Sequence, residues 1–139
     1  MIRCEQLIQE ARIARLKAYV PYSHFMVGAA ISTRDGKVYH GCNVENASYG
    51  LTNCAERTAF FSAIADGQTP GDITGIAVIA ETMGPISPCG ACRQVMLELG
   101  GPDLEVILTN LDGVIEKTTP ARLLPGAFTR EDLPPSDSV

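Results

Sequence analysis

The chain has 139 residues and a mass of 14.8 kDa, a length typical of one domain built around one hydrophobic core. Its net charge is −5 at pH 7, and its 11 basic residues are scattered singly rather than gathered in a stripe. Because polynucleotide binding needs clustered positive charge, this composition argues against a DNA or RNA partner and favours a small neutral ligand.

The composition also bears on assembly and location. Hydrophobic residues make up 45% of the chain and charged residues only 19%, so we expect apolar surface to be buried between subunits. No stretch approaches the ~20 apolar residues needed to cross a bilayer, and no basic segment with a long apolar run begins the chain. The five cysteines are an odd number. We therefore expect no membrane partner and a cytoplasmic location with reduced thiols.

The first part of the chain predicts a helix followed by a β-hairpin. Apolar residues recur every three or four positions over residues 3–18, which is typical of an amphipathic helix packed on a core. Residues 25–32 form an apolar run containing Gly28, which indicates a buried strand in tight contact with another element. Asp35-Gly36 then provides a turn, and residues 37–44 return as the second strand.

Two helix-and-strand units follow. Helices are predicted at 54–65 and 89–99, and strands at 73–80 and 104–109. Strands joined through helices imply an α/β sheet with helices on both faces. The remaining predicted elements are a short strand at 114–118, a brief helix at 120–124, an ordered loop at 124–128 and a frayed tail at 134–139. We expect residues 1–139 to form a single domain.

Three cysteines have the spacing of metal ligands. Cys89 and Cys92 are three residues apart, so both sulfurs would share one face of a helical turn if Ser87 is the N-cap and Pro88 the first helical residue. Cys54 would lie at the start of the other helix, and both helix dipoles would favour thiolates. Three ligands leave the fourth position of tetrahedral zinc free for water, as a catalytic site needs.

Glu56, two residues after Cys54, is the candidate that moves protons in such a site. Other interpretations stay open. Asn53-x-x-Glu56 also fits a capping box, in which Glu56 only accepts a backbone hydrogen bond. A Cys-x-x-Cys pair also occurs in redox sites and in four-thiol structural zinc sites. A fourth thiol would have to be Cys4 or Cys42, yet both fit small buried residues, so the combination favours catalytic zinc.

Five stretches carry a resemblance to a known family. They are Pro21-Tyr22-Ser23-x-Phe25-x-Val27-Gly28-Ala29-Ala30, Gly41-Cys42-Asn43-Val44-Glu45-Asn46-Ala47, Cys54-Ala55-Glu56-Arg57-Thr58-Ala59, Pro88-Cys89-Gly90-Ala91-Cys92-Arg93-Gln94 and Leu124-Pro125-Gly126-Ala127-Phe128. On these residues the chain resembles the small, homotetrameric, zinc-dependent cytidine deaminases of pyrimidine salvage over nearly its whole length.

The resemblance implies an α/β fold, a three-layer α/β/α sandwich with a five-stranded mixed sheet. It implies hydrolysis of cytidine and deoxycytidine to uridine and deoxyuridine with release of ammonia, one Zn²⁺ per subunit, and active sites shared within a homotetramer. Cys54, Cys89 and Cys92 would be the zinc ligands and Glu56 the proton shuttle. The implied substrate-binding residues are Phe25 on the pyrimidine, Asn43 and Glu45 at the ribose hydroxyls, Ala47 and Tyr49 in an inter-subunit wall, and Phe128 from a neighbouring subunit.

Two arginines are predicted to support the ligands. Three thiolates would leave zinc with a net negative charge and weaken its Lewis acidity. Arg57 and Arg93 lie next to the ligand residues and could offset that charge by hydrogen bonding to sulfur. The alternative for both is an ordinary solvated arginine.

Three other functions share part of the pattern. A deaminase of the antibiotic blasticidin S has the same zinc chemistry, but Asn43-x-Glu45-Asn46 fits a ribose-binding segment better. A polynucleotide deaminase would need a basic face. A zinc-binding module without catalysis would bind the metal and convert nothing.

Overall fold

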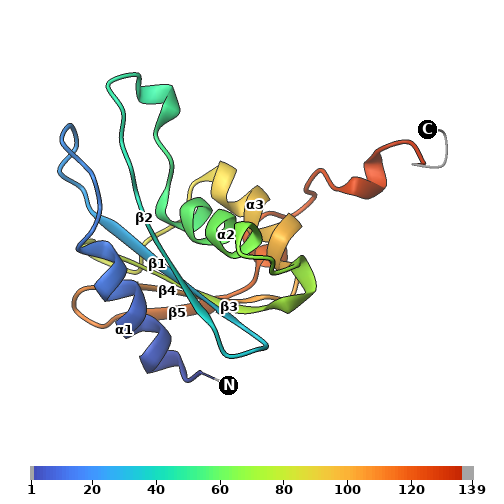
Figure 1. Cartoon of the computed structure of the whole chain (residues 1–139), viewed down its shortest axis with the longest axis horizontal. Coiled ribbons are helices and arrows are strands. Elements are labelled where there is room, and N and C mark those ends of the chain that lie inside the picture. The colour runs from blue at the N-terminus through green and yellow to red at the C-terminus, as the bar shows by residue number, and fades with distance from the viewer. Residues whose placement is uncertain (1, 136–139) are drawn as a thin grey trace.

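The computed structural model describes residues 2–135. Its centre is a five-stranded sheet in the order β2-β1-β3-β4-β5 (Figure 1). The strands are β1 (Val27–Thr33), β2 (Val38–Cys42), β3 (Ile73–Ala80), β4 (Glu105–Asn110) and β5 (Ile115–Thr118). The pair β3–β4 is parallel and the other neighbouring pairs are antiparallel, so the sheet is mixed, as expected.

Helices cover both faces of this sheet (Figure 1). They are α1 (Cys4–Arg15), α2 (Ala55–Ala65), α3 (Gly90–Gly100) and α4 (Pro120–Leu123), with short 3₁₀ turns η1 (Tyr49–Leu51), η2 (Pro70–Asp72) and η3 (Arg130–Asp132). One apolar cluster joins α1 to the sheet, and a larger cluster joins α2 and α3 to the opposite face. The three-layer α/β/α architecture predicted from the sequence is therefore confirmed.

The apolar run of the first strand is explained by burial on both faces. All residues of β1 are buried. Ala29 and Ile31 face the α2–α3 cluster, whereas Ala30 faces α1. Since successive side chains of a strand point to opposite faces, a central strand between two helical layers reads as continuously hydrophobic.

Two glycines bring helices against the hairpin. A Cβ on Gly28 would lie 2.1 Å from the backbone oxygen of Ala11, so α1 packs directly on β1, the tight contact expected from the sequence. A Cβ on Gly41 would lie 2.2 Å from the backbone oxygen of Ala55. The first turn of α2 therefore rests on β2, and this contact fixes where Cys54 lies.

Most predicted boundaries agree within one or two residues, and β3 agrees completely. The first helix ends three residues early, at Arg15, because Lys17 and Ala18 make shorter-range turn bonds to Ala14 and Arg15. Residues 136–139 lie outside the described part, so the frayed tail at 134–139 stays a prediction. None of the described helices is long and apolar enough to span a bilayer.

Candidate active site

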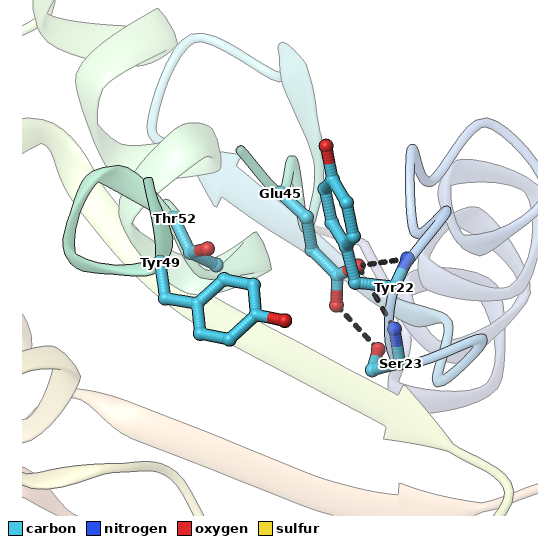
Figure 2. A pocket seen from close by; sticks show the side chains of 5 residues that line it. All are labelled: Tyr22, Ser23, Glu45, Tyr49 and Thr52. Carbon is cyan, nitrogen blue, oxygen red and sulfur yellow. Dashed lines mark hydrogen bonds between the residues drawn. The ribbon is translucent and has the colours of Figure 1, made fainter. Parts of the chain in front are cut away.

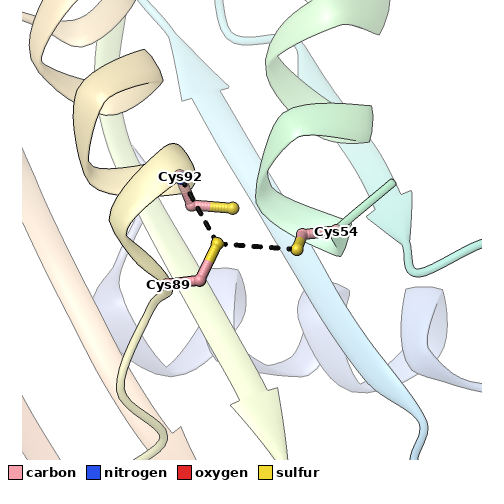
Figure 3. A group of neighbouring side chains, drawn as sticks. All are labelled: Cys54, Cys89 and Cys92. Atoms are coloured by element: carbon pink, nitrogen blue, oxygen red, sulfur yellow. Dashed lines mark hydrogen bonds between the residues drawn. The ribbon is translucent and has the colours of Figure 1, made fainter. Parts of the chain in front are cut away.

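The three predicted ligands meet at the starts of two helices (Figure 3). Cys54 is the N-cap of α2 and Cys89 the N-cap of α3, while Cys92 lies in the first turn of α3. Their sulfurs all lie within 4.8 Å of one another. The predicted helix start at Ser87 and Pro88 is wrong by two residues, because the Cys89 sulfur itself accepts the Cys92 N–H at 3.4 Å. All three cysteines therefore lie at a helix N-terminus, which favours thiolates.

The arrangement fits tetrahedral zinc. The Cys54 and Cys89 sulfurs are 3.7 Å apart, and a Zn–S bond of about 2.3 Å in a tetrahedron separates two sulfurs by about 3.8 Å. A disulfide would bring them to about 2.05 Å. Cys4 and Cys42 are not in the cluster, and the Cys42 thiol donates to Lys17 O at 3.5 Å. The four-thiol structural site therefore lacks its fourth ligand.

The electrostatics of the cluster favour ionised sulfur. The hydrogen bond from the Cys92 thiol, assisted by Arg57 and Cys89 and opposed by burial, lowers the pKa of Cys54 to about 5. Sharing its proton with Cys54 and being buried raise the pKa of Cys92. A bound cation reverses this second effect, because metal binding displaces the thiol proton. The hydrogen bonds among the thiols and from Arg57 thus favour a negative charge on the cluster.

Glu56 lies beside the sulfurs and is only 4% exposed. Because burial disfavours the carboxylate, it raises the pKa of Glu56, so the side chain can hold or release a proton closer to neutral pH. The capping-box interpretation is wrong. Cys54, not Asn53, is the N-cap, and the Asn53 amide donates instead to Thr58 Oγ1 at 3.0 Å.

A cavity of about 200 Å³ opens at this site. Five of the predicted site residues line it: Phe25, Asn43, Cys54, Glu56 and Cys89. Five more lining residues were not predicted: Val27, Thr52, Ala55, Ile86 and Ser87. Ala55 and Ser87 are adjacent to motif residues in the sequence, which could have indicated them. The apolar residues Val27 and Ile86 give no sign in the sequence that they face a cavity rather than the core.

A second cavity, of about 290 Å³, shares one lining residue with the first, and Figure 2 shows the side chains that line it. Tyr22, Ser23, Glu45, Tyr49 and Thr52 line it, and Thr52 also lines the cavity at the cysteines. The rings of Tyr22 and Tyr49 meet edge to face with centroids 5.8 Å apart. The predicted residues Glu45 and Tyr49 are therefore next to the metal site but in a separate, more polar compartment.

The Asn43 side chain lines the first cavity and also forms hydrogen bonds with the backbone of the segment before β1. Its Oδ1 accepts the Val27 N–H at 2.9 Å, and its Nδ2 donates to Phe25 O at 2.8 Å. The amide thus holds the segment that carries Phe25 at the cavity. Contact between Asn43 and a ribose hydroxyl stays a prediction.

Phe128 and Ala47 are not among the residues that line these two cavities. Phe128 is 61% exposed and borders a surface groove beside α3. The C-terminal arm after α4 extends away from the body of the chain (Figure 1). Gln94 of α3 donates to the Phe128 carbonyl oxygen at 2.8 Å and so holds the base of this arm. Ala47 is exposed in the loop after β2. Both placements leave these residues available to another chain.

The two arginines differ in what they contact. Arg57 Nη2 donates to the Cys54 sulfur at 3.3 Å, and the Cys54 thiolate raises the pKa of Arg57. The buried Nε of Arg57 has no hydrogen-bond partner among residues 2–135. Arg57 follows Cys54 by three residues and so shares its helix face. This geometry is the one predicted.

For Arg93 the predicted bond to sulfur is wrong. Each of its three nitrogens donates to an oxygen, namely Pro88 O, Leu123 O and Ser87 Oγ, at 2.7–2.8 Å. The reason is the helical period, because Arg93 directly follows Cys92 and points about 100° away from it around α3. Arg93 instead ties the loop before Cys89 to the end of α4.

A mixed α/β sheet that carries three thiols and a buried glutamate at two helix starts defines the class of zinc-dependent nucleobase deaminases. The family model "Cytidine and deoxycytidylate deaminase zinc-binding region" matches residues 1–108. The chain is 59% identical over 129 residues to the cytidine deaminase of Sporosarcina psychrophila, covering 93% of each. A crystal structure of cytidine deaminase from Burkholderia pseudomallei matches with a TM-score of 0.90 and 64% identity, covering 91% of this chain and 100% of that one.

A more distant relative is the blasticidin-S deaminase of Bacillus cereus, 34% identical over 111 residues, which are 75% of this chain and 77% of that protein. The family model and the two closer relatives show to which family the chain belongs. It belongs to the cytidine and deoxycytidylate deaminase family, and its cofactor is zinc.

The contact between Arg57 and Cys54 leads to a prediction. Arg57→Ala is expected to lower zinc affinity or turnover about 10–100-fold, because it removes the positive partner of a ligand thiolate. Titration with a zinc chelator and steady-state kinetics measure the two effects. Arg34→Ala, at an exposed arginine far along the hairpin, is the matched control and should behave as the unmodified protein. Unchanged zinc affinity together with unchanged kinetics in Arg57→Ala would remove this role.

Proposed function

We propose that the protein hydrolyses cytidine and 2′-deoxycytidine to uridine and 2′-deoxyuridine with release of ammonia, and that residues 1–139 act as one deaminase domain. One observation carries the proposal: three thiols within 4.8 Å of one another share a small cavity with a buried glutamate. The relatives named as cytidine deaminases support the same substrate.

When bound, zinc supplies Lewis-acid activation of a water molecule at neutral pH. Cys54, Cys89 and Cys92 would hold the ion. Glu56 takes a proton from the attacking water and gives it to N3 of the pyrimidine. It then takes the second proton from the new C4 hydroxyl and gives it to the amino group, which leaves as ammonia while the C4 carbonyl forms. Its burial suits both steps, because a raised pKa lets the carboxyl accept the proton and hold it until transfer.

The residues that line the two cavities suit different parts of a nucleoside. Phe25, Val27 and Ile86 give the metal cavity apolar walls against which a flat base can pack. Glu45 and Tyr49 provide polar groups in the adjoining cavity, where the sugar would lie. Together the two volumes fall within the roughly 300–1,000 Å³ typical of small-molecule sites. A nucleoside therefore fits better than a free base.

A comparison of substrates tests this assignment. Purified zinc-loaded protein is mixed in turn with cytidine, cytosine, a cytosine-containing oligonucleotide and blasticidin S, and the loss of absorbance is followed. The expected order places cytidine far ahead. Free cytosine lacks the sugar for the second cavity, blasticidin S lacks a ribose, and the oligonucleotide carries phosphates for which the chain has no cluster of basic residues. Faster conversion of blasticidin S or of the oligonucleotide would contradict the proposal.

We infer that the active unit is a homo-oligomer, and the family resemblance suggests a tetramer. Helix α2 is apolar on both sides: Ala59, Phe60 and Ala63 face the core, yet Phe61 and Ile64 are 47% and 37% exposed. Large apolar side chains on the outer side of a helix are normally covered by another element or another chain. A second chain covering α2 would satisfy this, as the sparse charge also suggests.

Phe128 is proposed to complete the pocket of a neighbouring chain. Stacking on a pyrimidine ring would give it about 1–3 kcal/mol, which an exposed side chain lacks. Mixing Phe128→Ala chains with Glu56→Gln chains tests this, since some hybrid sites would contain both intact residues. Activity above that of either parent is expected. Verified mixed oligomers with no recovery, or a fully active monomer in sedimentation, would rule out the shared site.

The same chemistry supports a role in pyrimidine salvage inside the cytoplasm. Zinc binding requires reduced cysteines, and the five cysteines of the chain are free thiols. Cell fractionation with an antibody to the protein tests the location.

A further inference from the structure

We propose that Ser23 is a positioning residue that orients the Glu45 carboxylate toward the sugar of the substrate and so sets selectivity for sugars that carry hydroxyl groups. The proposal deepens the proposed function and rests on it, because Glu45 is taken to contact the nucleoside. Ser23 lies in the turn before β1, 22 residues from Glu45, and both line the polar cavity (Figure 2).

The turn that contains Tyr22 and Ser23 donates hydrogen bonds to both oxygens of the Glu45 carboxylate. Glu45 Oε1 accepts the backbone N–H groups of Tyr22 and Ser23 at 3.0 and 3.1 Å, and Oε2 accepts the Ser23 hydroxyl. A carboxylate offers about four acceptor positions. With three of them filled from one turn, the orientation of the group is fixed, and the remaining position on Oε2 is available to a ligand.

The direction of the Ser23 hydroxyl is fixed as well. Ser23 Oγ accepts the N–H of Phe25 at 3.1 Å, so its own hydrogen is directed to Glu45. A chain of bonds thus runs from the residue predicted to pack on the base to the residue predicted to bind the sugar. Hydrogen bonds arranged in this way polarise and strengthen one another.

The turn depends on this contact because its backbone is unusual. His24 has φ +58°, in the left-handed region that few residues other than glycine adopt, while its N–H donates to Val20 O at 3.0 Å. Such a conformation persists only where its surroundings impose it. The bonds to Glu45 supply that constraint at an otherwise exposed turn.

The charge of Glu45 agrees with a role as acceptor. The hydrogen bond from Ser23 is the largest cause that lowers the pKa of Glu45, so the group is ionised at neutral pH and can only accept. Sugar hydroxyls are matching donors. Tyr49 and Thr52 line the same cavity across from Glu45 (Figure 2).

Removing the hydroxyl should change binding of the sugar and leave the chemistry intact. In Ser23→Ala, Oε2 loses its donor and the carboxylate can rotate about its broad terminal torsion. Water can replace the acceptor for the exposed Phe25 N–H, so the base contact is affected less. We expect KM for cytidine to rise about 10-fold, as for loss of a hydrogen bond to a charged group, with kcat within about 2-fold.

The test compares cytidine with 2′,3′-dideoxycytidine, which lacks the sugar hydroxyls assigned to Glu45. KM for the dideoxynucleoside is expected to rise less than about 3-fold in Ser23→Ala, and Ser23→Thr should restore the KM for cytidine. In a Glu45→Gln background, Ser23→Ala should add little, because the two residues act as a unit. Thr69→Ala, at an exposed hydroxyl-bearing residue that lines neither cavity, is the control.

Equal rises of KM for both nucleosides, or full additivity with Glu45→Gln, would overturn the proposal and leave Ser23 as a support of the turn. Unchanged KM for cytidine would overturn it too. Failure of the proposed function would look different, since the unmodified zinc-loaded protein would then convert neither nucleoside.

Discussion

Glu56→Gln is expected to keep the fold and the bound zinc and to lose turnover. The amide has nearly the same size as the carboxyl but cannot shuttle a proton, and general acid–base catalysis contributes about 10²–10⁴-fold. The buried position also tolerates a neutral side chain, because burial already raises the pKa of Glu56. Steady-state kinetics, metal analysis and circular dichroism together measure the three quantities.

Glu5→Gln is the matched control, since Glu5 is an exposed glutamate in the first turn of α1. It should retain normal activity. A zinc-loaded Glu56→Gln protein with near-normal activity would show that Glu56 only contributes to the start of α2.

The second large effect is expected at the cysteines. Cys54→Ala or Cys89→Ala should lower bound zinc below one ion per chain and remove activity, because a three-ligand site cannot hold zinc tightly with two. Cys92 is a less informative position. It is completely buried in the α2–α3 core, so truncation would also leave a cavity that costs stability.

Cys4→Ala and Cys42→Ala are the controls for this experiment. Neither sulfur belongs to the cluster, so both variants should keep their zinc and their activity. Loss of zinc in Cys42→Ala, measured by elemental analysis on folded protein, would point instead to a closed structural site.

The sequence predicts the parts of the site that depend on local helical geometry. Cys54 and Arg57 are three residues apart on one helix, and their contact follows from that spacing alone. For Cys89 and Cys92, the same reasoning from helical spacing depends on where α3 begins. Ser87 and Cys89 both precede a helix-forming segment, and the side chain that caps α3 is the cysteine. The spacing of Cys89 and Cys92 is unaffected by this shift, so the three sulfurs still lie together as expected.

Contacts that loops make with distant parts of the chain could not be predicted from the sequence. Arg93 binds Leu123 O, 30 residues away, and Asn43 binds the backbone on either side of Met26. Neither contact has a periodic signal, because the path of a loop is set by many weak tertiary interactions. The bond between Ser23 and Glu45 is of the same kind. The fold was more predictable, since hydrophobic periodicity and turn residues report directly on burial.

We expect this chain to deaminate cytidine with zinc held by three thiolates. The most direct measurement is product analysis after incubating purified, zinc-loaded protein with cytidine. We expect uridine and ammonia in equal amounts, loss of the reaction after removal of zinc by a chelator, and recovery when zinc is returned. A folded, oligomeric, zinc-bound protein that leaves cytidine unchanged would contradict it.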